Sequence, residues 1–258
     1  MRFPLLACLA AVWLSTLPAW GQTCPTGRAP PLPLRNTQAA LEANREVLIV
    51  TLGSSSTAGW HSTDLAHSYP AILQSELAAH LPQAHIAVVN RGIGGQDAAE
   101  MVQRLERDVL DIHPVLVIWQ VGANGAIRNA NPEEFQRLVA AGVQRLQRAR
   151  ADVVLMDNQR APSILASPAH ARIAQALQNV AIQTGAGLFA RGALMDRWQA
   201  AGRPYTEFIS DDGLHHNDLG YRCLGAAVAQ SVLDGLALQR LTGSLLRAVR
   251  AAALVGRY

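Results

Sequence analysis

The sequence predicts an α/β fold, organised as a three-layer α/β/α sandwich around a central parallel sheet of about five strands. Five short segments are apolar almost throughout instead of alternating, which is typical of strands buried on both faces of a parallel sheet. Helical segments separate these runs, and this β–α–β order favours parallel strands joined by crossover helices. The apolar runs cover residues 47–52, 85–89, 114–120, 152–156 and 187–190.

Signals at helix ends locate the intervening helices. Asn131, Pro132 and Glu134 combine an N-cap, a proline at the first helical position and a capping-box acid. Gly185 is placed to close the next helix in the left-handed conformation that glycine tolerates. The expected helices cover residues 68–80, 97–111, 131–149, 167–185 and 217–233.

The composition changes along the chain and predicts four segments. Residues 1–21 have a basic start, an apolar stretch and the small residues Ala19 and Gly21, which is the pattern of a cleaved signal peptide; an uncleaved anchor is the alternative. Residues 22–45 are expected to form a proline-rich linker and a short lead-in helix, and residues 46–235 the single large domain. Residues 236–258 are rich in Leu, Ala and Arg at roughly helical spacing, so they are predicted to form a helical extension. This extension either packs on the surface of the domain or contacts a membrane or a partner.

Composition and charge narrow the function classes. The net charge is only +3 and no block of adjacent basic residues occurs, so nucleic acid is not an expected partner. After the signal, no segment is long and apolar enough to predict stable membrane insertion. Export to the periplasm or the cell exterior leaves Cys24 and Cys223 in an oxidising compartment, where they are either a disulfide or a tail thiol and a small buried residue.

Glycine-rich and polar clusters follow the predicted strands, at the end of an open α/β sheet where ligands bind. Each cluster alone has an ordinary explanation as turn chemistry or as close backbone approach. Their joint occurrence at successive strand ends and before the last helix predicts a functional site. The clusters are residues 53–57 (GSSST), 90–95 (NRGIGG), 122–124 (GAN) and 211–215 (DDGLH).

The four clusters resemble the four sequence blocks of SGNH (GDSL-like) hydrolases. The segments VVNRGIGG, WQVGAN and DGLHHNDLGY carry the resemblance, which covers almost the whole predicted domain. It implies a flavodoxin-like topology and a serine esterase that needs no cofactor or metal. The block residues that it assigns are Ser55, Gly95, Asn124, Asp212 and His215.

Two positions depart from the family pattern. The usual GDS(L) reads Gly53, Ser54 and Ser55, so a serine replaces the aspartate before the nucleophile. The usual GxND reads GANG, with Gly125 in place of its aspartate. Neither lost aspartate belongs to the catalytic triad, so we expect a divergent branch that keeps the chemistry but packs these loops in its own way.

The chemistry of acyl transfer explains why these residue types belong together. A serine hydroxyl such as that of Ser55 is a poor nucleophile until an imidazole takes its proton. A carboxylate must then fix the imidazole tautomer, and the three-residue spacing of Asp212 and His215 can place both on one side of a turn. Backbone N–H groups of Ser55 and Gly95 and the side-chain amide of Asn124 would form the oxyanion hole.

Neighbouring residues leave alternatives within the site. Ser54 and Ser56 flank the predicted nucleophile, and His216 lies next to the predicted base. A metal site built from Asp211, Asp212, His215 and His216 is a further alternative. A G-x-S-x-G elbow of the α/β-hydrolase type is disfavoured, because it requires glycine where this chain has Thr57.

Three functions remain in view. The leading hypothesis is hydrolysis of short-chain, preferably acetyl, carboxylic esters, with a small ester or an acylated carbohydrate as substrate. The alternatives are a polysaccharide O-acetyltransferase that uses the same triad, and a non-catalytic glycan-binding protein. His61, His67 and Tyr69 follow the nucleophile and are candidates to line the acyl or leaving-group pocket.

Overall fold

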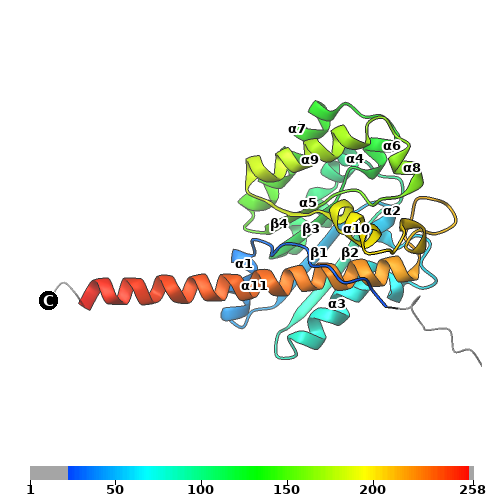
Figure 1. The fold of residues 1–258 in the computed structure, drawn as a ribbon. Coiled ribbons are helices and arrows are strands. Elements are labelled where there is room, and N and C mark those ends of the chain that lie inside the picture. Colours follow the sequence, from blue (N-terminus) through cyan, green and yellow to red (C-terminus); the bar gives the residue numbers. More distant parts are fainter. Residues whose placement is uncertain (1–22, 256–258) are drawn as a thin grey trace, which may run out of the picture.

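The computed structural model describes residues 23–255, with side chains described as far as residue 244. The predicted signal peptide, residues 1–21, lies outside the described residues. The protein folds around five parallel strands in the order β2-β1-β3-β4-β5 (Figure 1). The strands are β1 (Val47–Gly53), β2 (Ile86–Gly92), β3 (Leu116–Gln120), β4 (Asp152–Met156) and β5 (Gly187–Phe189). Each overlaps a predicted strand.

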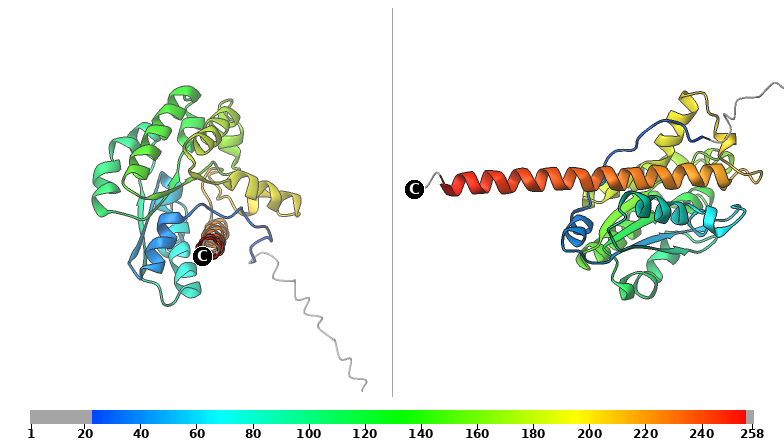
Figure 2. Two further views of the ribbon diagram at one scale, coloured as in Figure 1. Left: turned by 90° about the vertical axis from the view of Figure 1, so that its left-hand side faces the viewer. Right: turned by 90° about the horizontal axis from the view of Figure 1, so that it is seen from below.

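Two helical layers cover the sheet and confirm the predicted three-layer α/β/α sandwich (Figures 1 and 2). Successive residues of β3 explain the layers, because Val117 and Trp119 pack in one apolar core and Ile118 packs in the other. The first core includes α4 (Ala98–Gln103), α5 (Leu105–Asp108), α7 (Pro132–Arg148) and α9 (His170–Thr184). The second includes α1 (Arg35–Glu42), α3 (Tyr69–His80), α10 (Arg191–Ala200) and α11 (Asp218–Val255).

Two predicted helices differ from the structure. The segment expected as one helix over 97–111 divides into α4, α5 and a 3-10 turn (Leu110–Ile112), with the first break at Arg104. The last helix was expected to end near residue 233, but α11 continues to Val255. Gly235 does not stop it; a Cβ there would lie 2.4 Å from the Leu32 carbonyl oxygen, so this glycine lets the N-terminal segment cross the helix closely.

Several short helices in the loops between the main elements were not predicted from the sequence. They are α2 (Ser55–Ala58), α6 (Ala123–Ile127), α8 (Pro162–Leu165) and the 3-10 turns Leu65–His67 and Tyr205–Glu207. Such one-turn elements carry no hydrophobic period that a sequence could reveal. Two of them, α2 and α6, hold predicted site residues.

The N-terminal segment is fastened to α11. Cys24 and Cys223 form a disulfide that joins positions 199 residues apart. Ser231 donates from its hydroxyl to the Pro30 carbonyl, and Leu32 is buried in the core. The far end of α11 extends away from the body (Figures 1 and 2). Within residues 23–255, no helix has the length and apolar character needed to cross a bilayer.

Candidate active site

Ser55 lies just beyond the carboxyl end of strand β1, which is paired on both sides by β2 and β3, and it begins the short helix α2. Gly53 ends the strand in a crowded position, since a Cβ there would meet the Thr57 hydroxyl at 2.0 Å. Because the chain turns directly after this glycine, Ser55 is presented at the edge of the sheet and is 7% exposed. The predicted position of Ser55 at a strand end is observed, and the structure adds the one-turn helix that holds it.

His215 joins Ser55 to Asp212. Its Nε2 atom lies 2.7 Å from the Ser55 hydroxyl oxygen, and its Nδ1 atom lies 2.5 Å from Asp212 Oδ2. The structure therefore brings together the three residues that the sequence predicted as a triad. The arrangement is the one that transfers a proton from a serine to an imidazole oriented by a carboxylate.

Four hydrogen bonds hold the Asp212 carboxylate in its ionised form. Partial burial opposes ionisation, but donors from Ser210, His215 and the Leu214 backbone outweigh it and hold the pKa of Asp212 well below its usual range. An ionised carboxylate only accepts hydrogen bonds, so the proton of neutral His215 resides on Nδ1. The Nε2 lone pair then faces the Ser55 hydroxyl, as a general base requires.

The predicted oxyanion residues lie on the two segments that follow β2 and β3. Gly95 has φ of +79°, a left-handed conformation that favours glycine. Asn124 is the second residue of α6 (Ala123–Ile127), and its side-chain amide donates to the Gln96 carbonyl at 2.8 Å. That hydrogen bond uses one of the two amide protons and ties α6 to the Gly95 loop, which leaves the second proton for a ligand.

The alternatives for the nucleophile and the base have other partners. The Ser54 hydroxyl donates to Gln120 Oε1, and the Ser56 hydroxyl accepts from Gln159. His216 is fully buried and donates from Nδ1 to the Phe208 carbonyl, away from Asp212. Among these candidates, Ser55 and His215 lie within hydrogen-bond distance of each other, and this geometry favours them over the alternatives.

Gln120, the last residue of β3, explains how the chain accommodates serine at position 54. Its Oε1 accepts from the Ser54 backbone N–H, the Ser54 hydroxyl and the Thr57 hydroxyl, at 3.0, 3.0 and 3.2 Å. A carboxylate at position 54 would bring a second acceptor to an oxygen that needs donors. The departure from GDS(L) is therefore matched by a local hydrogen-bond network.

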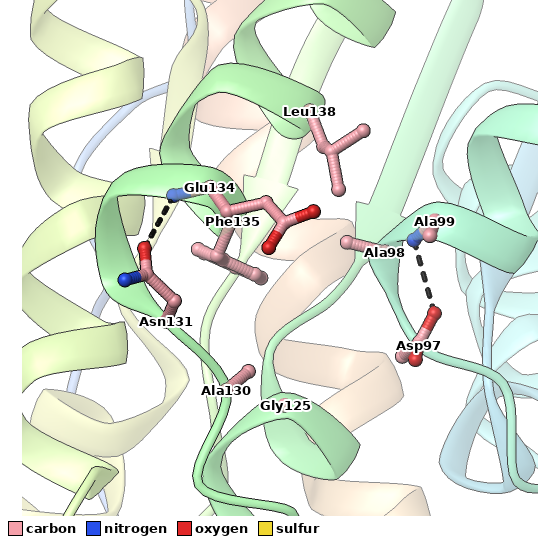
Figure 3. Close-up of a pocket in the computed structure, with 9 residues that line it drawn as sticks. All are labelled: Asp97, Ala98, Ala99, Gly125, Ala130, Asn131, Glu134, Phe135 and Leu138. Atoms are coloured by element: carbon pink, nitrogen blue, oxygen red, sulfur yellow. Dashed lines mark hydrogen bonds between the residues drawn. The ribbon is translucent and has the colours of Figure 1, made fainter.

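The second departure, Gly125, borders a small cavity. A pocket of about 160 Å³ lies between α4, α6 and α7, and the triad residues do not line it (Figure 3). A Cβ at Gly125 would make only ordinary contacts with Ala130 and Phe135, at 3.7 and 3.8 Å. The absence of a side chain at this position thus leaves open space behind Asn124.

Two arginines that the sequence analysis overlooked connect the site loops. Buried Arg104 donates to the carbonyls of Gly53 and Arg91 and to the Gln96 side chain. Arg128 donates to the Gly95 carbonyl at 2.8 Å. These guanidinium groups tie the loop after β1 to the loop after β2, and no local sequence signal distinguishes them from surface arginines.

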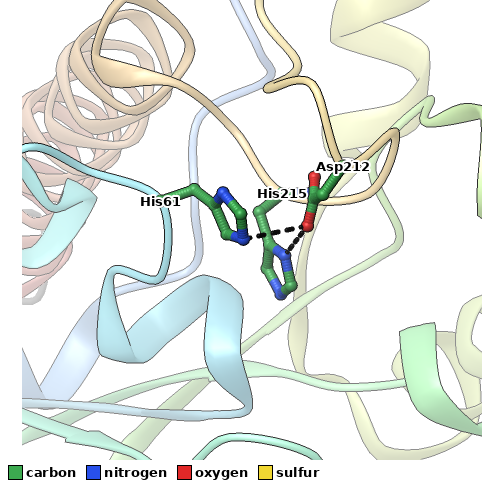
Figure 4. A group of neighbouring side chains, drawn as sticks. All are labelled: His61, Asp212 and His215. Carbon is green, nitrogen blue, oxygen red and sulfur yellow. Dashed lines mark hydrogen bonds and ion pairs between the residues drawn. The ribbon is translucent and has the colours of Figure 1, made fainter.

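The loop after α2 places two aromatic rings beside the base. The His61 ring stacks on His215 with centroids 5.1 Å apart, and its Nε2 lies 3.2 Å from Asp212 Oδ2 (Figure 4). Trp60 is 53% exposed, with its ring 5.8 Å from that of His215. The other suggested pocket residues lie elsewhere: His67 pairs with Asp218, and Tyr69 is buried.

The one group of potential metal ligands found among the described residues is His61, Asp212 and His215. It differs from the cluster considered from the sequence, because His216 faces the Phe208 carbonyl and His61 takes its place. The sequence suggested His61 as a pocket residue but did not predict its contact with Asp212, because 150 residues of chain lie between the two.

Comparisons with known proteins agree with this architecture. Residues 24–238 match the non-GDSL lipase-like family. The chain is 29% identical over 126 residues to an arylesterase of Vibrio mimicus. The aligned segment covers 48% of this chain and 60% of the arylesterase, so the chain spans less than two thirds of this relative's length.

Solved structures share the fold. A two-domain esterase active on acetylated mannans superposes with a TM-score of 0.69 at 22% identity, over 81% of this chain and 55% of that one. An acetylxylan esterase from Geobacillus stearothermophilus gives 0.62 at 18% identity, over 72% and 93%. With residues 24–238 matched, the chain belongs to the non-GDSL lipase-like family.

Proposed function

We propose that this protein is an exported serine esterase that hydrolyses short-chain esters, chiefly acetyl esters on carbohydrate, through an acyl-Ser55 intermediate. The hydrogen-bonded series Ser55–His215–Asp212 carries the proposal. The family match and the arylesterase relative support the same class of reaction.

In the acylation half-reaction, His215 Nε2 takes the proton of Ser55 as its oxygen attacks the ester carbonyl. Asp212 stabilises the imidazolium that forms. The tetrahedral oxyanion accepts hydrogen bonds from the Ser55 and Gly95 N–H groups and from Asn124. Collapse breaks the ester C–O bond, and His215 gives its proton to the departing alkoxide.

In the deacylation half-reaction, a water molecule replaces the alcohol. His215 Nε2 removes a proton from this water as it attacks the acyl-Ser55 carbonyl, and the same oxyanion donors stabilise the second tetrahedral intermediate. The proton then returns to the Ser55 oxygen as the carboxylic acid leaves. An acceptor sugar in place of water would make the enzyme an acetyltransferase.

A fluorophosphonate probe tests the nucleophile. We expect one covalent adduct on the purified protein and loss of labelling in Ser55→Ala, while Ser56→Ala, with a hydroxyl that faces Gln159, should still be labelled. Intact-protein mass spectrometry reads the result. Labelling that survives in Ser55→Ala would refute the assignment, and absence of labelling in both the parent and Ser56→Ala would favour a non-catalytic protein.

The exposed Trp60 indole supports a carbohydrate substrate. An exposed tryptophan beside a reactive centre offers a broad apolar face with a polar edge, which suits the face of a sugar ring. Two proteins of the same fold are described as acting on acetylated mannans and as an acetylxylan esterase. These observations favour acetylated polysaccharide over long-chain lipid.

Substrate profiling separates these possibilities. Trp60→Ala should lower kcat/KM on an acetylated oligosaccharide roughly tenfold, about 1.4 kcal/mol, and leave hydrolysis of p-nitrophenyl acetate nearly unchanged. Rates on acetyl, butyryl and octanoyl esters report the acyl preference, and product analysis with a sugar acceptor reports transfer. An equal loss on both acetyl substrates would contradict a sugar-binding role for Trp60.

Export is proposed from the disulfide and from the N-terminal sequence. Disulfides persist mainly in oxidising compartments, and Cys24 follows the predicted cleavage site by three residues. Fractionation of cells that express the full chain, with N-terminal sequencing of the mature protein, tests this. A start at residue 22 in the periplasm or medium is expected; an intact N-terminus in the cytoplasm would contradict export.

A further inference from the structure

His61, Asp212 and His215 form a three-ligand cluster that the proposed mechanism does not explain. Potential ligand atoms of the three side chains lie within 4.8 Å of one another (Figure 4). His61 Nε2 and His215 Nδ1 both approach the same oxygen, Asp212 Oδ2, at 3.2 and 2.5 Å. Catalysis by a serine triad needs only one of these two imidazoles.

The backbone holds His61 firmly in this position. Its φ of +66° lies in the left-handed region, which few non-glycine residues adopt. The Trp60 carbonyl accepts from the Tyr221 hydroxyl at 2.7 Å on one side. On the other side, Asp218 accepts from both the backbone N–H and the hydroxyl of Thr63. The second imidazole is therefore preorganised beside the carboxylate.

Two imidazoles and a carboxylate are ligands that zinc binds, and one of the three ligand-atom pairs already has the separation of a tetrahedral zinc site. Zinc prefers two or three imidazoles with a carboxylate, at ~2.0–2.1 Å, and in a tetrahedral site two ligand atoms then lie about 3.3 Å apart. His61 Nε2 and Asp212 Oδ2 already have this spacing. The His215–Asp212 contact must open by less than one ångström. We propose that these three residues bind Zn²⁺, with water as the fourth ligand, and that zinc reversibly inhibits the enzyme.

Inhibition follows from the tautomer that zinc imposes. Zn²⁺ would take the Nδ1 lone pair of His215, so the ring proton moves from Nδ1 to Nε2. Neutral His61 likewise binds through Nε2 and carries its proton on Nδ1. No net proton is lost, and the three protein ligands displace water from the hydrated ion until one zinc-bound water remains. His215 Nε2–H can then only donate to Ser55, so the base is lost while the fold is kept.

The inhibition experiment rests on the proposed esterase activity. With untagged, chelator-treated protein, Zn²⁺ should inhibit p-nitrophenyl acetate hydrolysis, EDTA should restore it, and Mg²⁺ should have no effect because it prefers oxygen ligands. His61→Gln should raise the half-inhibiting Zn²⁺ concentration roughly tenfold or more, relative to its own uninhibited rate. His67→Gln is the matched control, since His67 pairs with a carboxylate but has no third ligand, and its zinc sensitivity should stay unchanged.

Calorimetry with Zn²⁺ separates the metal site from the esterase assignment. One Zn²⁺ should bind to Ser55→Ala, which lacks the nucleophile but keeps all three ligands, and affinity should fall when His61→Gln is added. This result would support the site even if the protein had no esterase activity. Equal zinc affinity with and without His61, or no binding at millimolar zinc, would overturn the proposal.

Discussion

The imidazole of His215 lies 2.7 Å from the hydroxyl of Ser55, although 160 positions separate the two residues. Ser55 lies just beyond the end of strand β1, and His215 lies in the loop before the last helix, α11. Their contact depends on how α11 and its preceding loop pack against the sheet. Several measurable consequences follow from the groups that fix this contact.

Replacing Asp212 by asparagine should reduce kcat by ~10³–10⁴, because an amide can donate to Nδ1 and favour the wrong His215 tautomer. KM should change little, since the carboxylate does not contact the substrate. Steady-state kinetics on p-nitrophenyl acetate measure the effect. Asp211→Asn is the matched control, and a comparable loss there would contradict the assigned role of Asp212.

Removing the Asn124 amide should lower kcat by roughly 10²–10³. The loss should fall on kcat more than on KM, because the donor serves the oxyanion and not the ground-state ester. Asn124→Ala also removes the bond to the Gln96 carbonyl, so stability must be measured beside the rate. A large fall in thermal stability with a small fall in kcat would assign Asn124 to loop support alone.

Arg104→Met should destabilise the protein by about 2–4 kcal/mol, because it strips donors from the carbonyls of Gly53 and Arg91 in a buried location. Arg107→Met should change stability much less, since that side chain is 75% exposed and its ion pair with Asp108 is screened by solvent. Urea denaturation measures both. Equal effects would show that Arg104 does not hold the loops.

Removing the disulfide should cost about 2–5 kcal/mol of stability, because the bond constrains a long stretch of the unfolded chain. The double variant Cys24→Ser with Cys223→Ser should unfold at lower urea, and a reductant should destabilise the parent but not the variant. If the reductant leaves the parent unchanged, the cysteines are not paired in the purified protein.

Acid should destabilise the fold partly through His216. Burial, and then the positive charge of Arg191, lower the pKa of His216 to about 3. In the unfolded chain, this histidine has a pKa of about 6.5. Between pH 3 and pH 6.5 the unfolded state therefore binds a proton at this side chain and the native state does not. Stability is retained above pH ~6.5 and falls as the pH decreases toward 3, by at most ~1.4 kcal/mol per unit from this group.

A pH series of urea denaturation curves tests this prediction. His216→Asn should flatten the slope of stability against pH in the acid window, even if the variant is less stable throughout. His80→Asn, at an exposed helix end, is the control and should keep the parent slope. A parent slope unchanged by His216→Asn would show that other groups govern the acid response.

The sequence by itself determined the sheet and the chemistry at its edge. Strands buried on both faces leave apolar runs, and an Asp-x-x-His pair with a post-strand serine specifies one reaction type. Each of these patterns lies within a few consecutive residues, so it can be recognised from the sequence alone. The predicted fold class was confirmed, and the predicted site residues lie in the loops and one-turn helices that follow the strands or precede α11.

Tertiary structure decided which neighbours surround that chemistry. These contacts join residues that are far apart in the sequence. Ser54 pairs with Gln120 across 66 positions, Arg104 contacts Gly53 across 51, and His61 approaches Asp212 across 151. Nothing in the local sequence separates a buried arginine or a ligand-like histidine from an ordinary surface residue. Only packing fixes their surroundings, because desolvation and partner distance, and not residue type, set what a polar side chain does.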